Sequence, residues 1–249
     1  MKIGIITAMP EEFRAVAGIL GAADSMKFGS LRAGRFNTAE HDILLVESGM
    51  GFDNAARAAE ALIHDTCPDL LITTGFCGGI APELQAGDVV VAKTIIIANE
   101  SGSDEIPVQL SNVGPTFVAR QATEGHRVVE GAFVSTTTIT SKKYLAEMLS
   151  DRYRNAVVEM ESGAIAVVAA KNNIPLLAIR AVSDSAAEEL KFSLDEFCTP
   201  DMRRIHPGKV LLTILRKPRI TPQLMRLSRS SRKAAESLSV TLSRLFPLL

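Results

Sequence analysis

The sequence has few cysteines and lacks a long apolar run, and each absence excludes a class of protein. Its three cysteines, Cys67, Cys77 and Cys198, have the spacing of neither a disulfide framework nor a metal site. No uncharged apolar stretch approaches the roughly 20 residues that span a bilayer. The opening residues reach Glu11 and Glu12 too early for a signal peptide. We therefore expect a reduced, cytoplasmic protein without a metal or an organic cofactor.

An overall excess of charge is also lacking. The formal net charge is −1, which gives no signal for nucleic-acid binding. The charge is uneven, however, because 11 Lys and Arg accompany only two Asp and Glu from Pro200 onward. The length fits one domain, residues 1–249, in which we expect residues 200–249 to form a basic C-terminal helical extension.

Apolar runs alternate with helix-like segments between residues 1 and 184. The predicted strands are 2–7, 41–48, 70–74, 88–97, 128–138, 156–158 and 175–182. The predicted helices are 10–20, 54–64, 162–172 and one that begins after Ser141. Residues 99–115 predict an irregular loop. This alternation predicts a single-domain three-layer α/β/α fold with a central mixed sheet.

Two glutamates flank Met160 directly after the short apolar run 156–158. Glu159 and Glu161 cannot both be buried cheaply. One interpretation is that they are acids at a helix N-terminus, where the helix dipole favours negative charge. The other is that one carboxylate accepts hydrogen bonds from a sugar diol.

The last predicted strand contains Arg180 and ends at Ser183 and Asp184. An arginine inside an apolar strand is costly unless it is paired. Asp184 by itself fits a turn residue as well as a functional carboxylate. The Gly-rich segment that begins at Gly75 predicts a turn that either cradles an anion or allows close backbone approach. It is neither a Walker motif nor a dinucleotide fingerprint.

Five motifs occur in the chain in the order AMPEE, SGMG, TTG-x-CGG, VEMES and RAVSD. Together they resemble the nucleoside phosphorylase and nucleosidase superfamily, and most closely the methylthioadenosine/S-adenosylhomocysteine nucleosidases. The resemblance covers residues 1–97 and 128–196 and is specific for the superfamily rather than for the substrate. It implies a central sheet that is partly barrel-like.

The resemblance also implies catalytic roles. Glu12 would activate the attacking water, and Arg180 would orient both Glu12 and that water. Asp184, backed by Ser183, would protonate the leaving base at N7. These roles fit the chemistry, because loss of a purine leaves an oxocarbenium-like sugar that needs an acid on the base and a base on the water.

For the substrate pocket, the resemblance implies that Met160 and Glu161 hold the ribose, with Glu161 accepting from its hydroxyls. Ile139 stands where close relatives carry an aromatic residue that stacks on the base, and the backbone of Thr140 would read the base edge. The residues expected to bind substrate are Gly75, Phe76, Ile139, Thr140, Glu159, Met160, Glu161, Arg180 and Ser183.

Two departures from the phosphorylase branch bear on the nucleophile. Thr73 stands where that branch has a phosphate-binding arginine, and Phe76 stands where a serine is common. A phosphate dianion needs charged donors, so these departures favour water as the nucleophile. Phe76 would also make the water side of the pocket more apolar.

The basic C-terminal segment has a helical apolar stripe. One interpretation is a helix packed on the domain with a solvated basic face. The other is peripheral contact with an anionic membrane, and the segment loosely resembles the tail of hopanoid-associated nucleosidases, which remove adenine from adenosylhopane. The residues of the stripe are Leu224, Leu227, Ser231, Ala234, Leu238, Leu242 and Leu245.

We therefore expect a nucleosidase that hydrolyses a 5′-substituted adenosine, such as methylthioadenosine, S-adenosylhomocysteine or adenosylhopane. Two alternatives stay open: a phosphorylase of the same fold and a catalytically silent nucleoside-binding protein. The expected partners are a small nucleoside and a second copy of the chain in a homodimer, with no nucleic acid.

Overall fold

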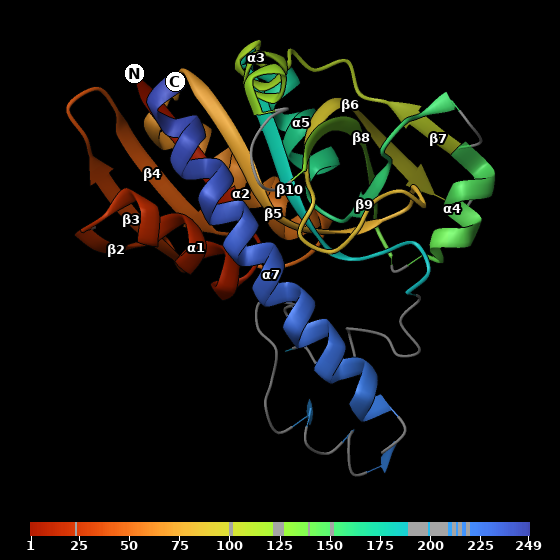
Figure 1. The fold of residues 1–249 in the computed structure, drawn as a ribbon. Helices are drawn as coiled ribbons and strands as arrows, with labels where there is room; N and C mark the ends of the chain where they lie inside the picture. The colour runs from red at the N-terminus through yellow and green to blue at the C-terminus, as the bar shows by residue number, and fades with distance from the viewer. Residues whose placement is uncertain are drawn as a thin grey trace.

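The strands of the chain form one mixed sheet, part of which closes into a barrel (Figure 1). This computed structural model describes residues 1–22, 24–99, 102–121, 127–138, 140–149, 152–188 and 220–249, together with 199, 209, 210, 213, 216 and 217. Across these residues the strand order is β10-β6-β8-β9-β5-β1-β4-β3-β2, and β7 pairs with β6 outside that order.

The centre of the sheet is parallel. Its four strands are β4 (Asp42–Glu47), β1 (Lys2–Thr7), β5 (Leu70–Gly79) and β10 (Leu176–Asp184), each paired with the next. Nearly all of their residues are buried, as is usual for parallel strands covered on both faces. The four apolar runs that predict these strands are thereby confirmed, and their carboxyl ends lie at one edge of the sheet.

Three further strands close the barrel. β6 (Val89–Asn99) pairs antiparallel with β10, β8 (Val128–Thr136) pairs parallel with β6, and β9 (Val157–Glu159) joins β8 to β5. Since β10 also pairs with β5, the five strands β5, β10, β6, β8 and β9 form a closed ring. The predicted mixed, partly barrel-like sheet is confirmed.

Two strands of the outer edge are not predicted from the sequence. β2 (Asp24–Phe28) and β3 (Leu31–Asn37) form an antiparallel hairpin, and β3 pairs with β4. The turn between them uses Gly29 with a φ of 60°, a left-handed conformation that glycine adopts without strain. The hairpin is polar, and its apolar and polar residues do not alternate regularly. Hydrophobic periodicity therefore does not indicate these two strands.

The predicted loop over residues 99–115 is wrong in part. β7 (Gly102–Glu105) pairs antiparallel with the end of β6, and α3 (Val113–Gln121) begins before the predicted loop ends. β7 consists of residues with low strand propensity. Its hydrogen bonds to β6 therefore come from a tertiary neighbour that local composition does not reveal.

Helices cover both faces of the sheet, which confirms the three-layer architecture. α2 (Phe52–Thr66) and α5 (Ser162–Lys171) pack on the face that contains Ile6, whereas α1 (Pro10–Leu20) packs on the face that contains Ile5. The Ala-rich faces of α2 and α5 allow these two helices to approach closely. None of the described helices combines the length and the apolarity that a bilayer crossing needs.

The C-terminal helix α7 (Thr221–Leu245) lies beside α1 and crosses the sheet near β10, and the short helix η4 (Phe246–Leu248) follows it (Figure 1). Its buried residues all belong to its C-terminal half, whereas the N-terminal half extends beyond the domain. The predicted stripe is therefore core only from Ala234 onward. Leu224 and Leu227 instead pack around Ile220.

Candidate active site

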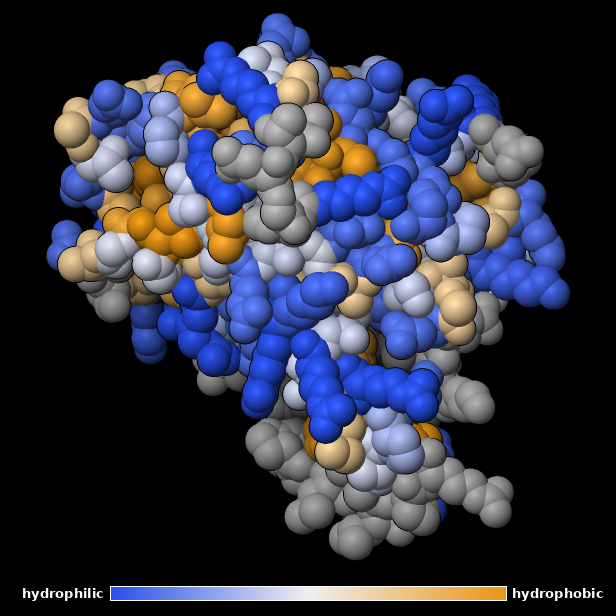
Figure 2. Space-filling view, in the orientation of Figure 1, coloured by the Kyte–Doolittle hydropathy of each residue, from blue (hydrophilic) through white to orange (hydrophobic). Residues whose placement is uncertain are grey.

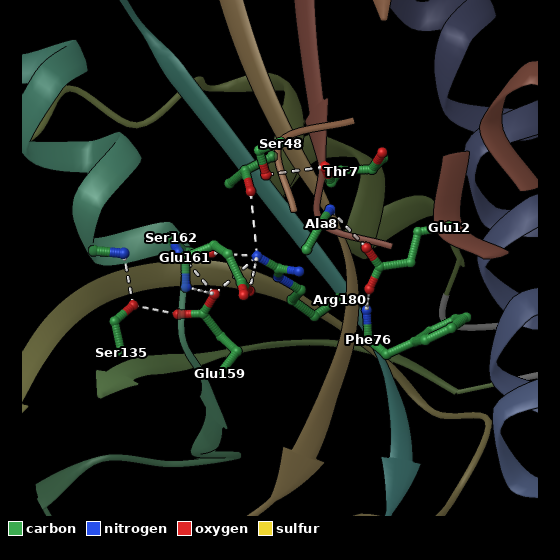
Figure 3. A network of polar contacts seen from close by, with 12 residues as sticks. Thr7, Ala8, Glu12, Ser48, Phe76, Ser135, Glu159, Glu161, Ser162 and Arg180 are labelled. Atoms are coloured by element: carbon green, nitrogen blue, oxygen red, sulfur yellow. Dashed lines mark hydrogen bonds and ion pairs between the residues drawn. The ribbon is translucent and has the colours of Figure 1, made fainter. Parts of the chain in front are cut away.

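Glu12 lies in the first turn of α1, and its carboxylate turns back onto the backbone. Oε2 accepts hydrogen bonds from the backbone N–H of Ala8 at 2.8 Å and of Met9 at 2.9 Å. Oε1 accepts from the backbone N–H of Phe76 on β5 at 2.7 Å (Figure 3). Because three donors hold a side chain that is 2% exposed, the carboxylate has one fixed orientation.

Arg180 is fully buried in β10, and acidic side chains surround its guanidinium (Figure 3). Its Nη2 donates to Glu159 at 2.8 Å and to Glu161 at 3.3 Å, and it also reaches the hydroxyls of Ser162 and Thr73. These contacts supply the pairing that a buried guanidinium requires. Among the described residues, Nε and Nη1 of Arg180 have no hydrogen-bond acceptor.

Gly75 brings the Glu12 and Arg180 side chains to the same point of β5. A Cβ at residue 75 would lie 2.4 Å from Oε1 of Glu12 and 2.5 Å from Nη1 of Arg180. The prediction of a Gly-rich turn that begins at Gly75 is wrong, because β5 continues as a strand to Gly79. The glycine leaves room for two functional side chains rather than making a turn.

The two glutamates around Met160 have different surroundings. Oε2 of Glu159 accepts from the backbone N–H of Glu161 and of Ser162 and from Arg180, and its Oε1 contacts the Ser135 hydroxyl. Glu159 thus accepts hydrogen bonds at the start of α5, as predicted for an acid at a helix N-terminus. It also forms an ion pair with Arg180. Its assignment to substrate binding stays a prediction.

Glu161 has fewer protein partners. Its Oε1 accepts from the backbone N–H of Gly51 at 2.9 Å, and its Oε2 faces Arg180. Burial raises the pKa of Glu161 to about 7, although Arg180 and Gly51 act in the opposite direction. Burial also raises the pKa of Glu12, again against Arg180 and the three backbone donors. Glu161 therefore exchanges a proton more readily near neutral pH than an ordinary glutamate does.

The raised pKa of Glu161 makes folding stability pH-dependent. The folded state holds this proton up to about pH 7, whereas the unfolded chain releases it near 4.5. The contribution is therefore fully present below pH 4.5 and is lost as the pH rises to about 7. Urea denaturation should show wild type losing up to about 3 kcal/mol relative to Glu161→Gln across this range. The exposed control Glu60→Gln should show no such difference, and parallel curves for wild type and Glu161→Gln would contradict the assignment.

Asp184 ends β10, where it pairs with Gly78 of β5, three residues beyond Gly75. The hydroxyl of Ser183 lies 2.5 Å from its Oδ1, in agreement with the expectation that Ser183 backs it. The ammonium of Lys142 contacts its Oδ2. Lys142 is the contact of Asp184 that sequence reasoning missed. Its signal is a cation at the first position of α4 (Lys142–Leu149), where the helix dipole disfavours positive charge.

The remaining predicted residues contribute in different ways. Phe76 joins the site through its backbone N–H, and its ring extends away from Arg180 into the apolar cluster beneath α1 and α7 (Figure 3). That Phe76 makes the water side of the pocket more apolar stays a prediction. Met160 is half-buried, and the hydroxyl of Thr140 donates to the carbonyl of Thr138 at 3.0 Å. Ile139 lies outside the described residues.

This fold and this site define a class: an α/β protein with a partly closed mixed sheet and an acid-rich site at its strand ends. The chain belongs to the phosphorylase superfamily, whose family model matches residues 2–213. The chain is 28% identical over 233 residues to the 5′-methylthioadenosine/S-adenosylhomocysteine nucleosidase of Bacillus thuringiensis subsp. konkukian (strain 97-27), covering 86% of this chain and 98% of that one. The nucleosidase of Bacillus anthracis matches to the same extent.

Solved structures agree in fold. The 5′-methylthioadenosine/S-adenosylhomocysteine nucleosidase of Neisseria meningitidis, in complex with methylthio-immucillin-A, matches with a TM-score of 0.74 and 22% identity over 100% of this chain and 99% of that one. The futalosine hydrolase of Helicobacter pylori strain 26695 matches with a TM-score of 0.75 and 18% identity over 100% and 98%. The Colwellia psychrerythraea nucleosidase, in complex with adenine, matches with a TM-score of 0.72 and 21% identity, covering 98% of this chain and 94% of that one.

Proposed function

We propose that the protein is a nucleosidase that hydrolyses the N-glycosidic bond of a 5′-substituted adenosine and releases adenine. The observation that carries the proposal is the pair Glu12 and Asp184, which contact the two ends of the segment 75–78 of β5: Glu12 meets Gly75 and Phe76, and Asp184 meets Gly78. A sugar–base linkage placed along this segment has a carboxylate for the water at one end and a carboxyl for the base at the other.

The attacking water is placed by Glu12 and Arg180. Nε and Nη1 of Arg180 are donors without an acceptor among the described residues, and Nη1 lies at the same face of Gly75 as Oε1 of Glu12. A water that accepts from Arg180 and donates to Glu12 has its lone pair free for C1′ of the sugar. Glu12 takes the proton as the bond to C1′ forms, and burial raises the pKa of this carboxyl, which makes it a stronger base than an ordinary glutamate.

The sugar and the base are held further along the site. Glu161, with Met160 beside it, accepts from the ribose hydroxyls, since among the described residues its two carboxylate oxygens have two hydrogen-bond partners, Gly51 and Arg180. Asp184, with Ser183, protonates N7 as the electron pair of the breaking bond enters the base. Thr140 and Ile139 hold the base edge in this assignment.

Electrostatics favour water over phosphate as the nucleophile. The single guanidinium of Arg180 faces three buried carboxyls, those of Glu12, Glu159 and Glu161. The hydroxyl of Thr73, which stands at the position of a phosphorylase arginine, is turned to Arg180. A phosphate dianion placed here would lie among these three carboxyls, with Arg180 as the cation that the described residues supply beside Glu12.

The substrate class rests on the relatives. The Bacillus relatives are named for 5′-methylthioadenosine and S-adenosylhomocysteine, and the Colwellia structure holds adenine. The futalosine hydrolase neighbour indicates that the same fold serves more than one hydrolase substrate. We assign adenine as the leaving base and a substituted 5′ carbon, with adenosylhopane as the lipid-bearing member of this class.

The proposal predicts adenine release that does not depend on phosphate. Methylthioadenosine, S-adenosylhomocysteine, adenosine and a 5′-alkylated adenosine are each incubated with the protein, with and without phosphate, and free base is measured by chromatography. We expect release from at least one 5′-substituted substrate at the same rate in both buffers. Strict phosphate dependence would identify a phosphorylase, and binding without release would identify a silent nucleoside-binding protein.

The N-terminal half of α7 supports a second property, peripheral contact with an anionic membrane. Arg226, Arg229, Arg232 and Lys233 are exposed there, and the side chain of Met225 beside them is 55% exposed. Figure 2 shows hydrophilic residues gathered over this part of the molecule. A basic helix half with an exposed apolar residue, extending from the domain, suits an anionic lipid surface.

Charge substitution tests this contact better than truncation, because Leu238, Leu242 and Leu245 of α7 belong to the core. Changing the four α7 cations to glutamine should lower partitioning onto phosphatidylserine vesicles about tenfold or more, at roughly 1 kcal/mol per cation. The control carries four glutamines at exposed cations elsewhere, namely Lys27, Lys93, Arg154 and Lys171. Equal partitioning of the two variants would contradict the membrane contact and would mean that α7 only packs on the domain.

We also propose that the protein is a homodimer, as expected from the resemblance. Light scattering on a size-exclusion column should give twice the chain mass of 26.7 kDa. A mass of one chain at micromolar concentration would contradict the dimer.

A further inference from the structure

Lys142 is a buried cation with more acceptors than its ammonium has hydrogens. Its side chain is 9% exposed, and Nζ contacts Oδ2 of Asp184. Nζ also donates to the backbone carbonyls of Asp184 at 3.2 Å, Ser185 at 2.7 Å and Glu188 at 3.1 Å. An ammonium offers only three protons, so these four acceptors engage all of them. Lys142 is therefore held in place by Asp184 and by the backbone that follows it.

The surrounding backbone makes room for this pair. A Cβ at Gly78 would lie 2.9 Å from Cε of Lys142 and 3.1 Å from Oδ2 of Asp184. The two carboxylate oxygens have different partners, because Oδ1 faces the Ser183 hydroxyl and Oδ2 faces Lys142. The carboxyl group is thus fixed in rotation as well as in position.

We propose that Lys142 is a positioning residue for the leaving-base step, an inference that rests on the proposed function. As Asp184 protonates the base, its O–H bond breaks, the N7–H bond forms, and the electron pair of the C1′–N bond enters the purine. The carboxylate that is left behind lies against the Lys142 ammonium. The ammonium stabilises this carboxylate through their direct contact as the proton leaves. Solvent returns the proton to Asp184 after the base departs.

A comparison of leaving groups separates this role from a structural one. Adenine must be protonated as it leaves, whereas 4-nitrophenolate leaves a 5-methylthioriboside without a proton. Lys142→Met should lower kcat/KM about tenfold or more for methylthioadenosine, within the ~10²–10⁴ that general acid catalysis supplies. For the 4-nitrophenyl riboside the same variant should lose less than about threefold. Lys143→Met, at an exposed neighbour on α4, should match wild type on both substrates.

A second arm does not depend on the folding of the single variant. Asp184→Asn and the double variant Asp184→Asn/Lys142→Met are compared on methylthioadenosine, and the double variant leaves neither charge unpaired. We expect the two to have equal activity within about twofold, since Lys142 acts only through Asp184.

Equal losses on both leaving groups, or a further loss in the Asp184→Asn background, would overturn the positioning role while wild type stays active. A wild-type protein that releases no base would overturn the proposed function itself, and this role with it. The two failures are therefore distinguishable.

Discussion

The Glu12→Gln variant should release adenine with a kcat/KM about 10² or more below wild type. A glutamine cannot take the proton of the attacking water, so the base-assisted part of the rate is lost. The carboxylate of Glu12 also accepts from the backbone N–H groups of Ala8, Met9 and Phe76. Because an amide has one acceptor oxygen and one NH₂ group, at least one of these contacts becomes donor to donor.

The neighbouring Glu11→Gln variant is the matched control. Glu11 lies on the same helical turn, but its side chain is 49% exposed and its partner is the exposed Arg14. We expect its kcat/KM to stay within about twofold of wild type, since such surface pairs contribute little. Circular dichroism of both variants establishes that the fold is intact. A fully active, folded Glu12→Gln protein would remove Glu12 from the mechanism.

Arg180→Met should be the most destabilising single substitution in the site. The guanidinium pairs Glu159 and Glu161, and its charge also lies near Glu12. Removing one partner of a buried ion pair costs about 3–5 kcal/mol, because the carboxylates are left buried without a counter-ion. Urea denaturation at pH 7.5 measures this loss, and adenine release should fall with it.

Arg35→Met provides the comparison for a surface arginine. Arg35 makes two contacts with Asp42, at 2.9 and 2.6 Å, but its side chain is 50% exposed. Arg35→Met should lower the free energy of unfolding by no more than about 1 kcal/mol. Arg180→Met should also regain stability as the pH is lowered, since its unpaired carboxyls then take up protons. Similar losses for the two variants, without this pH effect, would mean that Arg180 is not the counter-ion of the site.

The parallel centre of the fold could be predicted because its information is local. β1, β4, β5 and β10 are buried on both faces, so each appears as a continuous apolar run. The hairpin of β2 and β3 has no such pattern, and β7 depends on pairing with β6. These elements are set by tertiary neighbours rather than by their own composition.

The candidate site divides in the same way. Arg180 and Asp184 stand inside or at the end of an apolar strand, where a polar residue is conspicuous, whereas Glu12 in the first turn of α1 has a predicted role only through the family resemblance. The role of Gly75 could not be read locally, because a glycine that admits two distant side chains has the same sequence signature as a glycine in a turn. Lys142 lies 42 residues from Asp184, and only its unfavourable place at the start of α4 could have raised the question of a partner.

A structure of the protein with a non-hydrolysable 5′-substituted adenosine analogue tests the central claim most directly. We predict that N7 of the base lies within hydrogen-bond distance of Asp184, with the ribose hydroxyls on Glu161. A water between Glu12 and Arg180 should face C1′ from the opposite side of the ring. An analogue bound elsewhere, or one that leaves Glu12 and Asp184 in separate cavities, would contradict the account.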